Sequence, residues 1–303
     1  MIRTFTIIND HGQELLLDLF NPDDTGIVVM SVDGLGQVQS NMNFVDLAGY
    51  NYSKLTNKRL LKRNVVFDLK FIKSDTEETE ELVDRFFNTG EPVKVIVKTD
   101  KKELFFTGFT ESNEPTIFST GPDGTGARIS IVCPDPYLYD MGDSSTTFDA
   151  IEPLFEFPFC DGEEDQIQFG EIRIIKDRSI YYKGDESVGI VITIHALGII
   201  KDLVIYNLDT NEKIGINDAA LQTITGSGIV RGDDIIISTL DSQKTVTLIR
   251  DGNSINIINA LVKNPRPDWF KLSHGDNLFT YSASEGVYHV ALDIKYNNVY
   301  KGI

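Results

Sequence analysis

The chain has 303 residues, about twice the size of a usual single domain, so we expect two domains that each bury their own core. Its 41% hydrophobic and 24% charged residues exclude a wholly disordered or collagen-like protein. The 46 Asp and Glu residues outnumber the 28 Lys and Arg residues, and the resulting net charge of −18 disfavours binding to nucleic acid or to an anionic membrane.

The acidic residues are spread evenly. Residues 1–145 and residues 146–303 each have a net charge of −9. Because like charges of this size oppose random association, any oligomer must be held together by specific complementary surfaces.

The start of the chain and its apolar runs bear on where the protein is made. Residues 1–12 reach the polar Asn9 and Asp10 too early for the apolar core of a signal peptide. No apolar run approaches the roughly 18 residues that a membrane span requires. We therefore expect synthesis and first assembly in a cytoplasm.

Short runs of Val, Ile, Thr, Phe and Tyr alternate with Asn, Asp, Gly and Pro clusters, which predicts many strands joined by tight turns. Several runs alternate with period two, so one face packs on a core and the other faces water. The clearest predicted strands are residues 93–99, 103–109, 127–133, 171–177, 188–196, 203–208, 234–239, 244–250, 278–283 and 287–296.

One segment departs from the strand pattern. Ser74 and Glu77 have the spacing of a capping box, which predicts that a helix over residues 75–89 begins there. Leu82, Val83, Phe86 and Phe87 follow at helical spacing, and Gly90 ends the segment. This apolar stripe is expected to pack on the sheet of its own domain.

The domain boundary is predicted just after the strand over residues 127–133. Two prolines at alternate positions hold the backbone extended and remove hydrogen-bond donors, so a strand ends here. We expect residues 1–140 to form an N-terminal β-sandwich or barrel-like domain with one helix, and residues 141–303 to form a wholly β second domain. The predicted junction residues are Pro134, Asp135, Pro136 and Tyr137.

Two glycine-rich stretches resemble nucleotide-binding loops but lack their context. No Lys-Ser/Thr pair and no helical pattern follow residues 121–126, and residues 34–36 lack the third glycine of a dinucleotide-binding motif. Both are interpreted as turns. We expect no cofactor.

No catalytic or metal-binding constellation is evident. The four histidines are scattered without metal-ligand spacing, and no serine lies in a nucleophile elbow. Both cysteines lie in apolar surroundings and are interpreted as buried free thiols. The acidic residues beside glycines are interpreted as solvated turn residues. These residues are His11, His195, His274 and His289; Cys133 and Cys160; and Glu163, Glu164, Asp165, Asp233 and Asp234.

Trp269 is the only tryptophan, so it is the one indole available to stack on a sugar ring. It lies between a proline-rich segment and Phe270, which is typical of a loop that packs an aromatic ring onto its own sheet. Anchoring is the favoured interpretation, and a sugar contact is the alternative.

Blocks spread along nearly the whole chain resemble the distal tail protein (Dit) family of long-tailed phages and prophages. The blocks of the first half are the turn at residues 34–36, the helix, the strand pair at 93–99 and 104–109, and the Cys133–Tyr137 segment. In the second half, the matching stretches resemble the family's galectin-like β-sandwich, although no close set of His, Asn, Arg and Trp like that of a galectin sugar site is present. These stretches are residues 184–198, 205–208, 231–237, 244–252, 274–281 and 290–303.

The resemblance implies a structural, non-enzymatic protein of the virion tail tip, assembled in the bacterial cytoplasm. It implies a homohexameric ring whose N-terminal domain stacks between the tail tube protein and the tail-associated tip protein. It also implies that the C-terminal sandwich docks receptor-binding or accessory baseplate proteins. The sequence pattern agrees in offering strand edges that must be paired or covered.

Two other functions remain open at this point. One is a lectin-like adhesion module that binds glycan through Trp269 with Lys271 and His274 nearby. The other is a cell-wall hydrolase that uses two carboxylates.

Overall fold

The computed structural model divides the chain into two units. The first contains Met1–Gly142 together with Val299–Ile303, and the second contains Asp143–Asn298. Residues 299–303, which the sequence pattern predicts in the second domain, belong to the first unit. The structure describes residues 1–72, 76–117, 125–142, 144–148, 151–153, 170–172, 177–241, 243–263 and 267–303.

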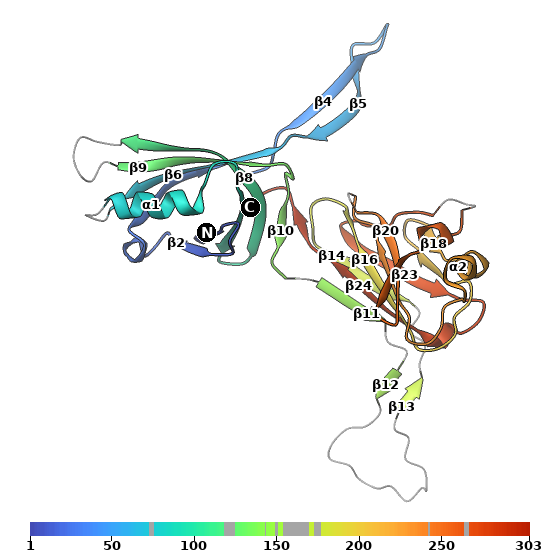
Figure 1. Ribbon diagram of the computed structural model, residues 1–303. Coiled ribbons are helices and arrows are strands. Elements are labelled where there is room, and N and C mark those ends of the chain that lie inside the picture. The colour runs from blue at the N-terminus through green and yellow to red at the C-terminus, as the bar shows by residue number, and fades with distance from the viewer. Residues whose placement is uncertain are drawn as a thin grey trace, which may run out of the picture. The chain divides into compact units, whose positions relative to one another are not determined.

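A nine-stranded antiparallel sheet forms the body of the first unit (Figure 1). Its main path runs β2-β1-β7-β8-β9-β6-β3, and β10 pairs with both β8 and β25. The strands are β1 (Ile2–Ile8), β2 (Glu14–Asp18), β3 (Ile27–Asp33), β6 (Arg63–Phe71), β7 (Pro92–Thr99), β8 (Glu103–Ile117), β9 (Thr125–Cys133), β10 (Leu138–Asp140) and β25 (Val299–Tyr300).

One face of this sheet carries the core of the first unit. Alternate residues of β6 are buried, as the period of a strand with one solvated face requires. The predicted helix is confirmed as α1 (Thr76–Phe86), which lies over the sheet and buries Val83 and Phe86 in the same core, with Phe87 just beyond it (Figure 1). Of its predicted capping residues, Ser74 lies outside the described part of the chain, and Glu77 lies in the first turn of α1.

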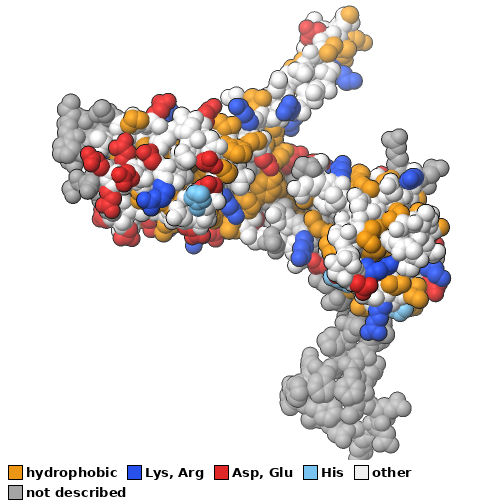
Figure 2. Space-filling view, in the orientation of Figure 1, with side chains coloured by type: hydrophobic (Ala, Val, Ile, Leu, Met, Phe, Trp, Pro, Cys, Tyr) orange, Lys and Arg blue, Asp and Glu red, His pale blue; other side chains and the backbone are white. Residues whose placement is uncertain are grey.

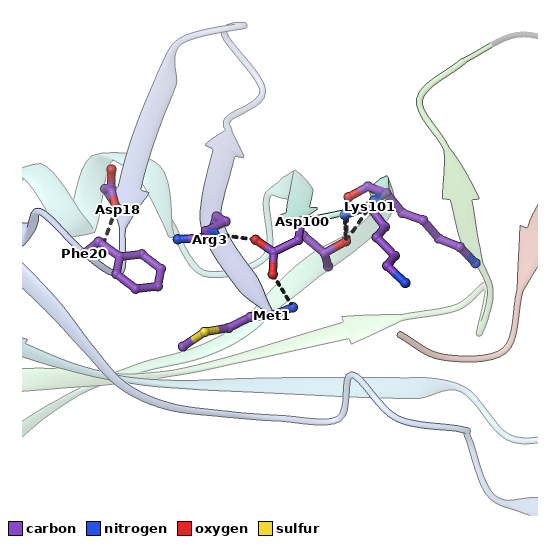
Figure 3. A network of polar contacts seen from close by, with 8 residues as sticks. Met1, Arg3, Asp18, Phe20, Asp100 and Lys101 are labelled. Atoms are coloured by element: carbon purple, nitrogen blue, oxygen red, sulfur yellow. Dashed lines mark hydrogen bonds and ion pairs between the residues drawn. The ribbon is translucent and has the colours of Figure 1, made fainter.

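Polar contacts tie the start of β1 to the turn between β7 and β8. The Asp100 carboxylate accepts hydrogen bonds from the Met1 amino group at 2.9 Å and from Arg3 Nε at 2.5 Å (Figure 3). These hydrogen bonds, first that of Met1 and then that of Arg3, lower the pKa of Asp100. Arg3 also lies 4.7 Å from the centre of the Phe20 ring, so one side chain links three segments of the unit.

The second unit is built from two larger antiparallel sheets and two short ribbons. One sheet has the order β11-β24-β16-β19-β20-β21, and the other has the order β14-β23-β17-β18. The described strands are β11 (Ser144–Phe148), β12 (Ile151–Pro153), β13 (Gly170–Ile172), β14 (Arg178–Tyr182), β15 (Val188–Gly189), β16 (Val191–Ala196), β17 (Val204–Asn207), β18 (Glu212–Gly215), β19 (Asp234–Ser238), β20 (Thr245–Arg250), β21 (Asn253–Asn256), β22 (Lys271–Leu272), β23 (Gly275–Ser282) and β24 (Val290–Tyr296).

Both larger sheets of the second unit contribute to one core, which makes this unit a β-sandwich. Ile192 and Ile194 of β16 lie in the same apolar cluster as Phe279 and Tyr281 of β23. The predicted mainly β fold is confirmed.

A helix in the second unit was not predicted. Residues 218–225 form α2 (Asp218–Thr225), so the expectation of a wholly β second domain was wrong. The Asn217 side chain caps this helix by accepting a hydrogen bond from the Ala220 amide at 2.8 Å. Gly226, at a φ of +79°, ends it in the left-handed conformation that glycine adopts without strain. Leu221 is buried, so the helix is held by the core of the sandwich.

Cys133 is a buried free thiol in the core of the first unit, whereas Cys160 lies outside the described residues. Burial raises the pKa of the Cys133 thiol to about 12. We expect Cys133 in the folded protein to resist alkylation at pH 8, because only the thiolate reacts and the site is closed to the reagent. Peptide mapping by mass spectrometry after iodoacetamide treatment, with and without urea, measures this. Alkylation without urea at the urea rate would contradict it.

Candidate functional site

An exposed hairpin is the most distinctive surface of the first unit. Among the described strands, β4 (Ser40–Asp46) and β5 (Ser53–Leu60) pair only with each other, and they project from the nine-stranded sheet (Figure 1). Every residue of the two strands is exposed except Ser40 and Leu60, which are half-buried at the base. Because an isolated two-stranded ribbon is at best marginally stable in water, a surface of this kind is typical of a binding element.

The register of the hairpin separates its side chains into two faces. Residues that lie directly opposite each other point to the same face. Met42 lies opposite Lys58 and Phe44 opposite Leu55, so these two pairs share one face. The pairs Asn41–Arg59, Asn43–Asn57 and Val45–Lys54 lie on the other face, which is mostly polar.

The first of these faces also carries Lys58, Asp46 and Ser53, and we call it the apolar face after its large apolar side chains, which are Met42, Phe44 and Leu55. Their exposed fractions are 48%, 56% and 45%, so about half of each side chain contacts water. At the turn, Tyr50 and Tyr52 are also exposed, with ring centres 5.3 Å apart. With Val45, which is exposed on the other face, six large apolar or aromatic side chains are thus displayed on one short ribbon.

Arg63 anchors the base of the hairpin. It is the first residue of β6, follows β5 closely, and is 1% exposed. Burial lowers the pKa of its guanidinium group, while Cys133 and Asp135 act in the opposite direction. The guanidinium donates hydrogen bonds to the backbone oxygens of Gly34 at 2.5 Å, Gly36 at 2.8 Å, Pro136 at 2.8 Å and Lys301 at 2.7 Å.

Two glycines allow the segments around Arg63 to approach closely. Gly34 has a φ of +86°, and a Cβ atom there would collide with the backbone oxygen of Asn64. At Gly302, a Cβ atom would lie 2.8 Å from the carbonyl carbon of Gly36. The turn before β4 and the end of the chain therefore meet backbone to backbone beside Arg63.

The C-terminal segment Val299–Ile303 completes this base. Val299 and Tyr300 pair with Tyr139 and Leu138 of β10, which extends the sheet of the first unit. The Tyr300 ring is 6% exposed and lies 3.7 Å from Lys102 Nζ. The Ile303 amide also donates to the backbone oxygen of Leu35 at 3.1 Å.

The four predicted junction residues lie inside the first unit, between β9 and β10. Pro136 is one of the four partners of Arg63. The Asp135 carboxylate accepts hydrogen bonds from the Tyr137 amide at 3.1 Å and from the Tyr139 hydroxyl at 2.5 Å. Pro134 is exposed and follows β9 directly. These residues shape the base of the hairpin, and the change of unit follows Gly142.

The Trp269 side chain is half-buried and packs against the core of the second unit. Lys244 Nζ lies 5.7 Å from the centre of its ring. The other two residues of the lectin hypothesis have separate partners, because Lys271 pairs with Asp241 at 2.8 Å and His274 lies 3.1 Å from the backbone oxygen of Gly184.

Replacing Trp269 with alanine is expected to lower the free energy of unfolding of the second unit by about 1–3 kcal/mol, because a half-buried ring leaves the core. Thermal unfolding followed by circular dichroism measures the loss. Tyr288→Ala is the matched control, since Tyr288 is 57% exposed in the same unit. An unchanged stability in Trp269→Ala would contradict the packing role.

Asp233 is not a solvated turn residue, so that prediction was wrong. It is 1% exposed, and its carboxylate forms an ion pair with Arg250 at 2.5 Å and accepts a hydrogen bond from the Val230 amide at 2.9 Å. The hydrogen bond to Asp233 raises the pKa of Arg250. Asp234 is the first residue of β19, and it lies 2.7 Å from His195 across the sheet in an exposed pair.

The remaining candidate residues do not form a site. His289 lies 3.2 Å from the backbone oxygen of Ile199, and the exposed His11 lies 3.7 Å from Asp10. Within the described ranges, no three His, Cys, Asp or Glu side chains come together as a metal site would require. Glu163, Glu164 and Asp165 lie outside those ranges. No helix in the described part of the chain has the length and apolar character needed to cross a membrane.

A solved phage protein has this arrangement of elements. The crystal structure of SPP1 Dit, described as a paradigm of the hub adsorption apparatus of phages that infect Gram-positive bacteria, matches with a TM-score of 0.64 at 14% identity. The match covers 97% of this chain and 98% of that chain. The chain has the SPP1 Dit fold. The resemblance inferred from the sequence is therefore confirmed for the fold of both units.

Two baseplate structures of phage P2 in the activated conformation, with Ca and with Sr, also match. Each has a TM-score of 0.49, identities of 13% and 15%, and coverage of 98% of both chains. No protein-family model and no curated protein matches the sequence. The similarity to SPP1 Dit therefore lies in the fold, because the sequence identity is low.

Proposed function

We propose that this protein is a structural hub of a phage or prophage tail tip. The observation that supports the proposal is the SPP1 Dit fold over 97% of the chain, which includes both units. In this function, the protein acts through the surfaces that it presents and carries out no catalysis. Its place is the tail tip of the virion, after assembly in the cytoplasm of the bacterial host.

The proposed assembly is a homohexameric ring. The first unit closes the ring and stacks between the tail tube protein and the tail-associated tip protein. The second unit, a galectin-like sandwich, is the platform on which receptor-binding or accessory baseplate proteins dock. The exposed hairpin of the first unit supports an assembly role, because apolar side chains displayed in this way are typical of protein–protein contacts.

Electron microscopy tests the proposed function. Negatively stained images of the purified protein, alone and with the tube and tip proteins encoded beside it, are expected to contain six-fold rings. Antibody against this chain is expected to label the tail tip of intact particles. A protein that stays monomeric alone and with both partners, or one that degrades purified cell wall in a zymogram, would contradict the proposal.

A further inference from the structure

The hairpin formed by β4 and β5 exposes its apolar face to water. In the described part of the chain, no strand other than β4 and β5 pairs with either one. Met42, Phe44 and Leu55 are about half exposed. Burying these apolar side chains against another surface would lower the free energy, because apolar surface would be removed from water. A contiguous apolar surface on an ordered element is typical of a contact that forms with another molecule.

The charge of the hairpin segment is opposite to that of the rest of the protein. Residues 40–62 contain four basic residues and one acidic residue, Asp46. The remaining residues contain 24 basic and 45 acidic residues. Figure 2 shows apolar and basic side chains along the hairpin, and many acidic side chains on the body of the first unit.

This contrast identifies the kind of partner. Lys58 lies on the apolar face beside Met42, with Asp46 nearer the tip of that face, and Arg59 and Lys54 flank it from the other face, so the ribbon as a whole is basic. A surface that is apolar and basic is complementary to one that is acidic. A second copy of this chain offers such an acidic surface, and the overall repulsion between copies makes specific complementary contacts necessary for association.

The base of the hairpin is built to hold the ribbon in place. The buried Arg63 binds the turn before β4 through Gly34 and Gly36, and the same guanidinium holds the segments at Pro136 and Lys301. An element whose base is already ordered loses less conformational entropy when it binds. This arrangement favours a preformed docking arm.

We propose that the apolar face of the hairpin, together with Lys58, binds the surface of a second copy of this chain. The inference rests on the proposed function, because it names the surface through which hub subunits would join. The tip tyrosines, Tyr50 and Tyr52, extend the same contact.

Association of the full chain tests the inference. The double variant Phe44→Ser with Leu55→Ser is expected to weaken the self-association constant about 100-fold, because two buried interface side chains are lost. The variant Lys58→Glu is expected to weaken association most at low salt, where charges are least screened. The matched control is Asn43→Ser with Asn57→Ser, which alters the polar face and leaves association unchanged. Analytical ultracentrifugation over a concentration series gives the constants.

A crosslinking measurement does not depend on the energetics of the variants. Phe44 is replaced by the photoreactive benzoylphenylalanine, and chains with heavy and light isotopes are mixed before irradiation. Crosslinks that join heavy to light chains are expected. Crosslinks confined to one chain, or formed only with another tail protein, would overturn the inference.

The outcomes separate this inference from the proposed function. Rings that form equally well from the wild type and from the apolar-face variant would overturn the docking arm and leave the hub function in place. A wild type that forms no ring alone or with tail partners would overturn both. Circular dichroism confirms that the variants fold, which is expected because the substituted side chains are exposed.

Discussion

Replacing Arg63 with alanine is expected to lower the free energy of unfolding of the first unit by about 3–5 kcal/mol. The change removes the donors of four hydrogen bonds and leaves the backbone oxygens of Gly34, Gly36, Pro136 and Lys301 without this partner. It also leaves a cavity where a fully buried side chain had been. The turn before the hairpin, the segment before β10 and the C-terminal segment all lose their common anchor.

The two units can be measured separately in this experiment. Trp269 is the only tryptophan and lies in the second unit, so its fluorescence reports the unfolding of that unit. Hydrogen exchange of peptides from β6 and β10 reports the first unit. Faster exchange in the first unit with an unchanged fluorescence transition is the expected result.

Two control variants define the role of Arg63 further. Arg63→Lys keeps the charge. We still expect it to lose most of the stability that Arg63→Ala loses, because one ammonium group cannot reproduce the planar set of donors. Arg128→Ala removes an exposed arginine of the same sheet, and a change of less than about 0.5 kcal/mol is expected. If Arg63→Ala and Arg128→Ala were equally stable, the anchoring role would be refuted.

Ending the chain at Asn298 is expected to destabilise the first unit by about 3–5 kcal/mol and to leave the second unit unchanged. The deletion removes the buried Tyr300 ring, its pairing with β10 and one of the four acceptors of Arg63. This outcome is unusual for removing five terminal residues, because chain ends are commonly dispensable.

The same two readouts measure the truncation. Ile303→Ser is the control, since the Ile303 side chain is 49% exposed and its backbone hydrogen bond to Leu35 is kept. Normal hydrogen exchange in β10 of the truncated protein would show that the segment contacts the first unit without stabilising it. A shift of the Trp269 fluorescence transition alone would show that the segment stabilises the second unit instead.

Strong local patterns predicted the regular elements well. The strands at residues 93–99 and 127–133 appear as β7 and β9, and the apolar stripe of residues 82–87 appears on α1 and the residue that follows it. The last predicted strand is shorter than expected, because residues 287–289 form a 3-10 turn before β24. These elements bury a repeating apolar face, and the repeat is visible in the sequence.

Weaker local signals were missed. The cap at Asn217 before α2 is a single polar residue, and the helix that follows is too short to repeat an apolar stripe. The hairpin at residues 40–60 does alternate Met42 and Phe44 with asparagines, with a glycine at its turn, and this alternation was the available signal. Its apolar face stayed unnoticed because a strand pattern does not reveal whether anything covers it.

The sequence by itself determined the strongly patterned strands and α1 and where their apolar faces lie, because both follow from residues close together in the chain. Only the tertiary structure decided that Arg63 meets the carbonyl of Lys301, that residues 299–303 return to the first unit, and that Asp233 is buried against Arg250. Contacts between residues far apart depend on where whole elements pack. No local spacing encodes them.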